Sequence, residues 1–350
     1  MARLMKGVVL PGNSTVEFRE YPVPEPGPGQ ALLKMKASSI CGSDIRAIYH
    51  KHHTEPGESY LGVIAGHEPC GQIVKAGPGL KKFKEGDRVI AYHIVGCGVC
   101  HECRKGYLIS CTGEGKAAYG WQRDGGHAEY MLADERSLVH LPDELTYLDG
   151  ALCACGFGTA YEALKLAGCS GRDQTLVVGL GPVGLAVLML ARAMGSTKLL
   201  GVDVTDERIE LAKKLGLVDV AFKPSDGVLQ QVRAETGGDG AEIAVDASGS
   251  AAGRLLAIQG ARRWGRVAFV GEGGTVTFEP SRDIIHRQIT IFGSWVCSVP
   301  NLEELVERLV RWKLHPDAIV THTFPLEQAG EAYRLVAEGK AGKVAITWPD

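Results

Sequence analysis

The chain has 350 residues, of which 45% are hydrophobic and 23% charged, proportions typical of a globular protein rather than a disordered chain. Its 38 lysines and arginines nearly balance its 41 acidic residues, and the formal net charge of -3 favours neither nucleic acid nor an acidic membrane as a partner. No apolar stretch approaches the roughly 18 residues that span a bilayer, and the opening residues are too weakly apolar for a secretion signal, so we expect a cytoplasmic protein.

The pattern of the sequence changes near residue 157, and the length exceeds what one hydrophobic core usually organises. Residues 1–150 contain short β-branched runs between glycine- and proline-rich turns, which predict a mainly β, barrel-like domain. Later runs such as TLVVGLG and KLLGVDV alternate with helical stretches such as ERIELAKKLG, which predicts βαβ units in a parallel sheet. After residue 292 we expect an amphipathic helix, NLEELVERLVRWKL, then a further helix and a final strand.

Four of the ten cysteines lie close together on one expected loop. They are Cys97, Cys100, Cys103 and Cys111. Clustered cysteines in a long intracellular chain bind metal more often than they form disulfides, and four thiolates on one loop predict a structural zinc ion. An iron–sulfur cluster is disfavoured because ferredoxin runs close with C-x3-C-P, whereas seven residues separate the last two cysteines here. The loop also has too few basic residues for a nucleic-acid-binding zinc module.

Other potential metal ligands are dispersed along the chain. They occur in CGSD (41–44), GHE (66–68) and CGFGTAY (155–161). A lone cysteine or histidine is usually buried packing. Together, and beside a dinucleotide fold, the three motifs suggest three ligands with an open fourth position, which distinguishes catalytic from structural zinc. The histidines of the segment 50–53 are interpreted as a solvated loop rather than as a further metal site.

The expected strand 175–178 leads directly into a glycine-rich turn that opens a helix. The turn consists of Gly179, Leu180, Gly181, Pro182, Val183 and Gly184. Such glycines allow a tight turn, a close approach of backbone to a pyrophosphate and close packing of the helix on the strand.

Asp203 ends the next expected strand, about twenty residues further on, where an acid binds the adenosine ribose and repels a 2′-phosphate. NAD is therefore favoured over NADP. Arg208 either reaches the same ribose or lies on a solvated helix face. The alternative for the whole motif is a plain glycine turn in an α/β sheet, with Asp203 as a helix cap.

In this order, CGSD, GHE, the four-cysteine loop, CGFGTAYEALK and VVGLGPVG resemble the zinc-dependent medium-chain alcohol and polyol dehydrogenases over nearly the whole chain. The resemblance implies a fold of the α/β plus β class. A GroES-like catalytic domain would comprise residues 1–156 and 294–350, and a Rossmann domain with a doubly wound parallel sheet would comprise residues 157–293. It also implies two zinc ions per chain, one catalytic and one structural, NAD as hydride acceptor, and a homotetramer.

The resemblance further implies roles for individual residues. Cys41, His67 and Cys155 would hold the catalytic zinc, with Glu68 as an outer or alternate ligand. Ser43 would accept the proton of the substrate hydroxyl. Polyol and threonine dehydrogenases of the family often have an acid where Cys155 stands, and Cys153 competes with it as a ligand. Arg46 replaces the histidine that ends the proton relay in many members, which leaves the route of the proton to solvent open.

The segment before the four-cysteine loop, 91–95, would form a wall of the substrate pocket. It offers the phenol of Tyr92 and the imidazole of His93, and Arg46 and Tyr49 add polar groups near the mouth. A hydrogen-bonding pocket predicts a polyol or sugar alcohol, oxidised at a secondary carbon, as the small-molecule substrate. The alternative for His93 is packing inside the protein.

The sequence has alternative interpretations in terms of function. Simple alcohols and L-threonine are alternative substrates within the family. A zinc-free enoyl or quinone reductase is disfavoured because that branch lacks the cysteine loop and the dispersed ligands. A non-catalytic NAD-binding zinc protein is disfavoured because all the expected catalytic residues are present.

Overall fold

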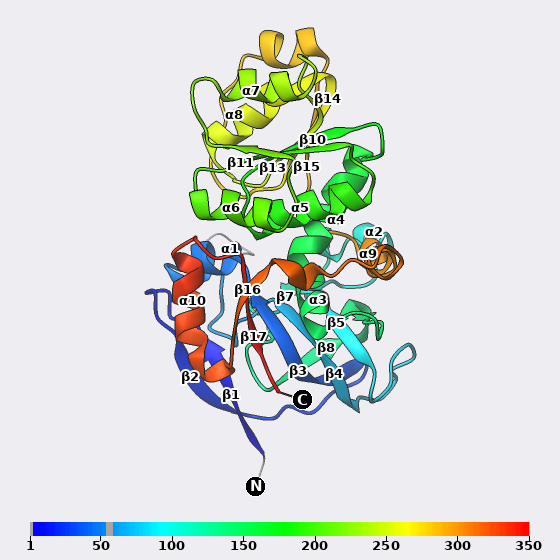
Figure 1. Cartoon of the computed structure of the whole chain (residues 1–350). Coiled ribbons are helices and arrows are strands. Elements are labelled where there is room, and N and C mark those ends of the chain that lie inside the picture. The colour runs from blue at the N-terminus through cyan, green and yellow to red at the C-terminus, as the bar shows by residue number, and fades with distance from the viewer. Residues whose placement is uncertain (1–2, 54–58, 350) are drawn as a thin grey trace. The chain divides into compact units, whose positions relative to one another are not determined.

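A computed structural model describes residues 3–53 and 59–349, and the backbone forms two compact units. The first unit contains both ends of the chain, Met1–Gly158 and Cys297–Asp350, and the second is the inserted segment Thr159–Val296. The boundaries expected from the sequence, after residue 156 and before residue 294, lie two and three residues away from these. Figure 1 colours the second unit from green to orange along the chain.

A mainly antiparallel sheet forms the centre of the first unit. Its strands among the described residues are β3 (Gln30–Ile40), β4 (Glu68–Ala76), β5 (Arg88–Ala91), β8 (Tyr130–Asp134), β9 (Leu138–His140), β16 (Val320–Phe324) and β17 (Lys343–Thr347). Their order is β16-β17-β3-β4-β5-β9, with β8 paired to β3 outside this path. Within this sheet, β16 and β17 form the only parallel pair among the described strands. The final strand of the chain thus lies inside the sheet.

The long strand β3 organises the core because both of its faces are buried. Side chains alternate between the faces of a strand. Ala31, Leu33 and Met35 therefore share one apolar cluster, while Leu32 packs with Ile64 in another. Two short ladders complete the strands of this unit, namely β1 (Leu4–Val9) with β2 (Glu17–Pro22), and β6 (Ile94–Val95) with β7 (Ala117–Ala118).

The helices of the first unit are short, apart from one near its C-terminal end. They are α1 (Gly42–Asp44), η1 (Ile45–Tyr49), α2 (His101–Arg104), η2 (Leu108–Ser110), η3 (Glu135–Ser137), α3 (Tyr147–Leu152), η4 (Cys153–Phe157), α9 (Val299–Trp312), η7 (Pro316–Ile319), η8 (Leu326–Gln328) and α10 (Ala329–Ala337). The Ser298 side chain caps α9 by accepting a hydrogen bond from the Asn301 amide. Leu302, Leu305 and Leu309 form its buried stripe, as the amphipathic pattern predicts.

The second unit has a parallel sheet with the order β12-β11-β10-β13-β14-β15. Its strands are β10 (Gln174–Val178), β11 (Lys198–Val202), β12 (Val220–Phe222), β13 (Ala241–Asp246), β14 (Ala261–Phe269) and β15 (Thr290–Gly293). Its helices are α4 (Gly158–Ala167), α5 (Pro182–Ala193), α6 (Asp206–Lys214), α7 (Val228–Glu235), α8 (Ala251–Gly260), η5 (Pro280–Ile284) and η6 (Ile285–Arg287). The strand order reverses between β10 and β13, and such a switch point is where doubly wound sheets bind ligands.

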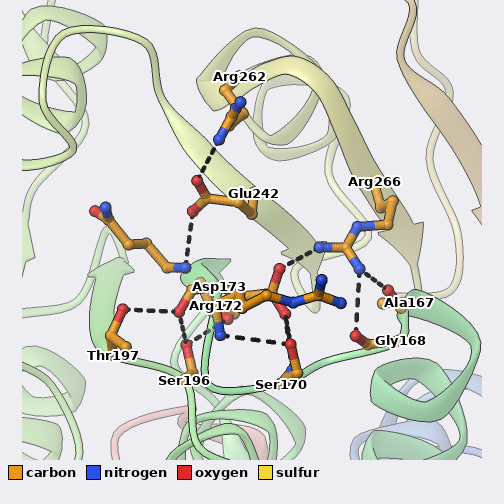
Figure 2. A network of polar contacts seen from close by, with 12 residues as sticks. Ala167, Gly168, Ser170, Arg172, Asp173, Ser196, Thr197, Glu242, Arg262 and Arg266 are labelled. Carbon is orange, nitrogen blue, oxygen red and sulfur yellow. Dashed lines mark hydrogen bonds and ion pairs between the residues drawn. The ribbon is translucent and has the colours of Figure 1, made fainter.

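Ion pairs and hydrogen bonds link the segments at the amino-terminal edge of this sheet (Figure 2). Arg266 pairs with Asp173 and donates a hydrogen bond to the Ala167 carbonyl. Nearby, Arg262 Nη1 lies 2.7 Å from Glu242 Oε1. Charged side chains therefore stabilise this edge, whereas glycine-rich loops leave the carboxyl ends of β10 and β14. Among residues 3–53 and 59–349, no helix is both long and apolar enough to cross a membrane.

Candidate active site

The potential ligands of the dispersed motifs come together in the first unit. The ligand atoms of Cys41, His67, Glu68 and Cys155 all lie within 4.8 Å of one another. The antiparallel register explains why two of these motifs lie close together, because Ser39 of β3 pairs with Glu68 of β4. Cys41 follows the end of β3 and His67 precedes the start of β4, so the two residues are neighbours across the pair of strands. Cys155 reaches the same place from η4.

Asp44 holds two of these residues in place. Its Oδ1 accepts a hydrogen bond from His67 Nδ1 at 2.7 Å, and its Oδ2 accepts one from the Cys41 amide at 2.9 Å. With Nδ1 engaged, His67 presents Nε2 to the cluster, which is the usual arrangement of a metal-binding histidine. A hydrogen bond with Cys155 lowers the pKa of the Cys41 thiol well below its ordinary value, although burial opposes this effect. One thiolate is therefore favoured within the cluster.

The carboxylate of Glu68 lies in a buried polar contact of its own. Its Oε2 is 2.5 Å from both Ser39 Oγ and Lys343 Nζ, and both Glu68 and Lys343 are almost completely buried. Glu68 Oε1 is also buried but has no hydrogen-bond partner among the described residues. An unpaired carboxylate oxygen beside two thiols and an imidazole fits a cation better than it fits an apolar core.

The structure separates the two neighbouring cysteines that competed as ligands. Cys155 belongs to the cluster, whereas Cys153 does not. Cys153 is completely buried, and burial raises the pKa of its thiol well above the usual value. Ser43 is half-buried in α1, and Arg46 is exposed on η1.

The segment before the cysteine loop brings the imidazole of His93 close to His67, but it does not bring the phenol of Tyr92 there. His93 is 6% exposed, its ring centroid lies 5.2 Å from that of His67, and its Nδ1 lies 2.9 Å from the Ala154 carbonyl oxygen. The expectation for the two tyrosines was wrong. Tyr92 is buried and donates its hydroxyl to the Cys297 carbonyl at 2.8 Å, and Tyr49 is 4% exposed and stacks on Tyr333. Sequence spacing does not reveal that these rings serve the core.

Two other groups of titratable side chains do not extend the site. His50 Nδ1 lies 2.8 Å from Ser14 Oγ, while His52 Nε2 lies 2.7 Å from the Leu10 carbonyl oxygen, so these histidines bind separate partners. Asp149, His315 and Asp317 form a further group of possible ligands. Both oxygens of Asp149 already accept hydrogen bonds, including one from the Asp317 amide at 2.9 Å. We therefore assign no metal to this group.

The four cysteines of the loop also converge within 4.8 Å of one another. Cys97 and Cys103 have their sulfurs 4.0 Å apart, and Cys100 and Cys111 theirs 3.9 Å apart, so these are free thiols rather than disulfides. Backbone amides point at the sulfurs, and these hydrogen bonds, chiefly that from Cys103, lower the pKa of Cys100 to about 5. A Cβ added at Gly113 would lie 2.6 Å from Cys97 Sγ, so the loop has no room for a side chain there. The arrangement suits a closed tetrahedral metal site.

In the second unit, the glycine-rich turn has the geometry of a phosphate-binding loop. Gly179 has a φ of +95°, and a Cβ there would lie 2.7 Å from the Ser248 amide nitrogen. A Cβ at Gly184 would overlap the Gly179 carbonyl oxygen, whereas the nearest atom to one at Gly181 is 3.8 Å away. Gly181 is the N-cap of α5 and has no side chain to engage the free amides of that helix. These amides remain available for an anion.

Asp203 lies directly beside this turn. Its Oδ2 accepts a hydrogen bond from the Leu180 amide at 2.6 Å, and its Oδ1 accepts one from the Thr205 amide at 2.8 Å. Arg208 Nη1 lies 3.6 Å from the same carboxylate. Asp203 is thus a fixed acid at the carboxyl end of β11, with a cation beside it.

Sequence reasoning missed Lys343 and Ser39. Lys343 is far from Glu68 along the chain, and no local motif contains it. Ser39 lies just outside the CGSD motif. The available signal was its spacing of two from the apolar Ala37, which places both side chains on the same face of the strand. Asp44 was part of the quoted motif, but its contact with His67 could not be read from spacing.

Comparison with known families agrees with this geometry. Residues 27–143 match the alcohol dehydrogenase GroES-like domain, and residues 182–311 match the zinc-binding dehydrogenase domain. The chain belongs to the zinc-dependent medium-chain alcohol dehydrogenase family, which confirms the family and the fold predicted from the sequence.

Several relatives match over nearly their full length. YphC of Escherichia coli K12, an uncharacterized zinc-type alcohol dehydrogenase-like protein, is 54% identical over 99% of this chain and 100% of its own. L-threonine 3-dehydrogenase of Pyrococcus horikoshii is 33% identical, covering 99% and 98%. Sorbitol dehydrogenase of Halalkalibacterium halodurans is 30% identical, covering 98% and 99%. Among solved structures, the alcohol dehydrogenase RspB of Escherichia coli CFT073 with NADH has a TM-score of 0.87 at 25% identity, covering 99% of each chain.

Proposed function

We propose that the protein is a zinc- and NAD-dependent dehydrogenase that oxidises a secondary alcohol, a polyol or sugar alcohol, to a ketone. The observation that supports this most directly is the convergence of Cys41, His67 and Cys155 beside the unpartnered oxygen of Glu68, among the residues described. In this proposal residues 1–156 and 294–350 form the catalytic domain, and residues 157–293 form the NAD-binding domain.

Two zinc ions have separate tasks in this proposal. Cys41, His67 and Cys155 would hold the catalytic ion, with Glu68 as an alternate ligand that Lys343 and Ser39 orient. When bound, this ion supplies Lewis-acid chemistry that lowers the pKa of a hydroxyl group. The four cysteines of the loop would hold the structural ion.

The reaction separates a proton from a hydride. Ser43 would accept the proton of the substrate hydroxyl, because it lies two residues from Cys41 and is half-buried. Arg46 is exposed and stands where many family members have the histidine that ends the proton relay. The proton would therefore reach solvent without a histidine at that position. The hydride would leave the carbon that bears this hydroxyl and pass to the nicotinamide, whose chemistry is the cofactor's own.

The protonation of His93 supports a polyhydroxylated substrate. Burial lowers the pKa of His93 to about 4, so the imidazole is neutral near pH 7. Its Nδ1 must donate to the Ala154 carbonyl, and Nε2 is therefore an acceptor without a proton. Such an acceptor beside His67 would bind a second hydroxyl of the substrate, which a simple alcohol lacks.

Asp203 supports NAD rather than NADP. Each carboxylate oxygen accepts one backbone hydrogen bond and keeps a lone pair for a ribose hydroxyl. A 2′-phosphate would meet the same negative charge. Arg208 would complete the ribose contact from the other side of the carboxylate.

The test is an NADH-production screen across polyols, diols, L-threonine and simple primary alcohols, together with metal analysis. We expect about two zinc ions per chain and the highest kcat/KM for a polyol. A plain primary alcohol exceeding every polyol would contradict the substrate class, and L-threonine ahead of the polyols would assign the activity of the Pyrococcus relative instead. A His93→Ala variant should lose polyol turnover, whereas His127→Ala, another buried histidine, controls for the loss of packing.

Two further features belong to the proposal. We expect a homotetramer, and β15 supplies an edge strand of the parallel sheet that could pair between subunits. Light scattering showing a monomer at micromolar concentration would contradict this. We also expect the protein in the cytoplasm, which cell fractionation would test.

A further inference from the structure

Three loops at the carboxyl edge of the parallel sheet pack backbone against backbone. They follow β10, β13 and β14. A Cβ added at Gly179 would lie 2.7 Å from the Ser248 amide, and one added at Gly249 would overlap the Glu272 carbonyl. These contacts leave no space for side chains between the loops: the first joins the loops after β10 and β13, and the second joins the loops after β13 and β14.

The third loop, 271–274, is held at its first residue, where the Gly271 amide donates a hydrogen bond to the Asp246 carbonyl at 2.9 Å. Gly273 and Gly274 have positive φ values of +88° and +62°, and residues 272–274 are exposed. Glycine loses more conformational freedom on ordering than any other residue, and an exposed loop gains little from apolar burial. A loop of this composition needs hydrogen bonds from elsewhere to keep one conformation.

Arg254 of α8 supplies these hydrogen bonds. Its Nη1 donates to the Gly274 carbonyl at 2.8 Å, and its Nη2 donates to the Gly271 carbonyl at 2.8 Å. The side chain is 14% exposed, and its guanidinium lies over the Phe269 ring at 5.6 Å from the centroid. Only a planar, forked donor group can reach two carbonyls in this way.

The same arginine is linked to the second loop through Asp246. Asp246 is fully buried, and its Oδ2 lies 3.6 Å from Arg254 Nε. The carboxylate accepts hydrogen bonds from Ser248 Oγ at 2.6 Å and from the Gly249 amide at 3.2 Å. One ion pair therefore orders both loops: Asp246 holds the loop after β13, and Arg254 holds the loop after β14.

The topology indicates which part of a dinucleotide these loops would meet. The two halves of a doubly wound sheet each bind one mononucleotide, on either side of the switch point. Asp203 marks the adenosine half at the end of β11, and the glycine turn after β10 marks the pyrophosphate. The nicotinamide half must then lie over the carboxyl ends of β13 and β14.

We propose that Arg254 is a positioning residue that fixes the loop 271–274 so that its backbone can bind the nicotinamide half of the cofactor. The inference rests on the proposed NAD site. Arg254 acts through the loop and does not itself touch the reacting atoms. Its loss should therefore weaken the binding of the whole dinucleotide and leave the adenosine half unaffected.

The experiment measures the Kd of NADH and of ADP, which lacks the nicotinamide half, for the full-length protein and its variants. In Arg254→Met we expect the Kd of NADH to rise about tenfold or more while that of ADP changes less than about twofold, because two charge-assisted hydrogen bonds are lost only on the nicotinamide side. Arg254→Lys keeps the charge but cannot span both carbonyls, so it should show the same selective loss with near-parental melting temperature. Arg262→Met removes an arginine ion pair at the opposite edge of the same sheet (Figure 2) and should change neither Kd.

Unchanged NADH affinity in both Arg254 variants would overturn the proposal. Equal losses for NADH and ADP would also overturn it, because they would indicate a general disturbance of the domain. If the parent protein bound neither compound, the proposed NAD site itself would be wrong and the role of Arg254 would fall with it.

Discussion

Replacing Asp44 by asparagine should weaken the metal site proposed at Cys41, His67 and Cys155 without removing any of its proposed ligands. Asp44 is completely buried, accepts the Nδ1 proton of His67 at 2.7 Å and accepts the Cys41 amide at 2.9 Å. An asparagine has one acceptor oxygen instead of two and no charge, so at least one of these contacts is lost. The imidazole is then free to rotate and to change its tautomer.

The magnitude follows from the number of ligands that Asp44 orients. Losing the outer partner of one metal-bound histidine lowers metal affinity by about 10- to 100-fold, which corresponds to about 1.4–2.8 kcal/mol. Because Asp44 contacts two of the proposed ligands, His67 and Cys41, we expect the upper part of this range. The assay is zinc retention per chain against a graded series of a competing chelator, in which the transition of one of the two ions should shift.

Asp149 provides a matched control. It is also completely buried, lies at the same position of a short helix, and accepts hydrogen bonds from the Thr146 amide and from His315 Nδ1, each at 2.9 Å. Asp149→Asn should therefore cost comparable folding stability and leave both zinc transitions in place. Equal zinc affinity in Asp44→Asn and the parent, or an equal shift in both variants, would refute the reasoning.

Three further predictions concern other parts of the molecule. Cys100→Ser should remove one zinc ion per chain and lower the melting temperature, and full metal content in this variant would contradict the structural site. Asp203→Ala should narrow the preference for NAD over NADP in steady-state kinetics, and a parent enzyme that prefers NADP would refute the role of Asp203. Burial lowers the pKa of His127 to about 4, below its value near 6.5 in the unfolded chain. The unfolded state therefore binds the extra proton first, and stability should fall by up to about 1.4 kcal/mol per pH unit as the pH drops from 6.5 to 4. In His127→Gln, the unfolding free energy obtained from denaturation curves should depend less steeply on pH across this range, by the contribution of one proton.

Features that depend on short stretches of sequence were predictable. The four-cysteine loop spans 97–111, and the spacing alone brings its sulfurs within reach of one ion. The glycine turn after residue 178 and Asp203 could be recognised because strand, turn, helix and strand follow one another directly. The amphipathic pattern of 301–314 also gave the helix now seen as α9, two residues earlier at each end.

Features that depend on long-range pairing were not predictable from the sequence. Lys343 neutralises Glu68 only because β17 pairs with β3, which in turn pairs with β4. The direction of a side chain was equally inaccessible: Tyr92 and His93 are adjacent, yet one binds the Cys297 carbonyl and the other faces His67. Arg254 lies in an ordinary helical stretch, and its partners are carbonyl groups, which leave no signature in the residue types.

The place of β17 inside the first sheet has a consequence for how the protein is made. A chain emerging from the ribosome in order would complete the whole inserted unit before β17 appears. Until then β3 lacks one neighbour, and the carboxylate of Glu68 lacks its buried cation. Because Lys343 is the first residue of β17, the end of β3 and β4 beside the proposed metal ligands should be the last part of the molecule to mature. Stalling synthesis before residue 343 would then yield nascent chains in which the inserted unit resists protease while 1–158 remains susceptible.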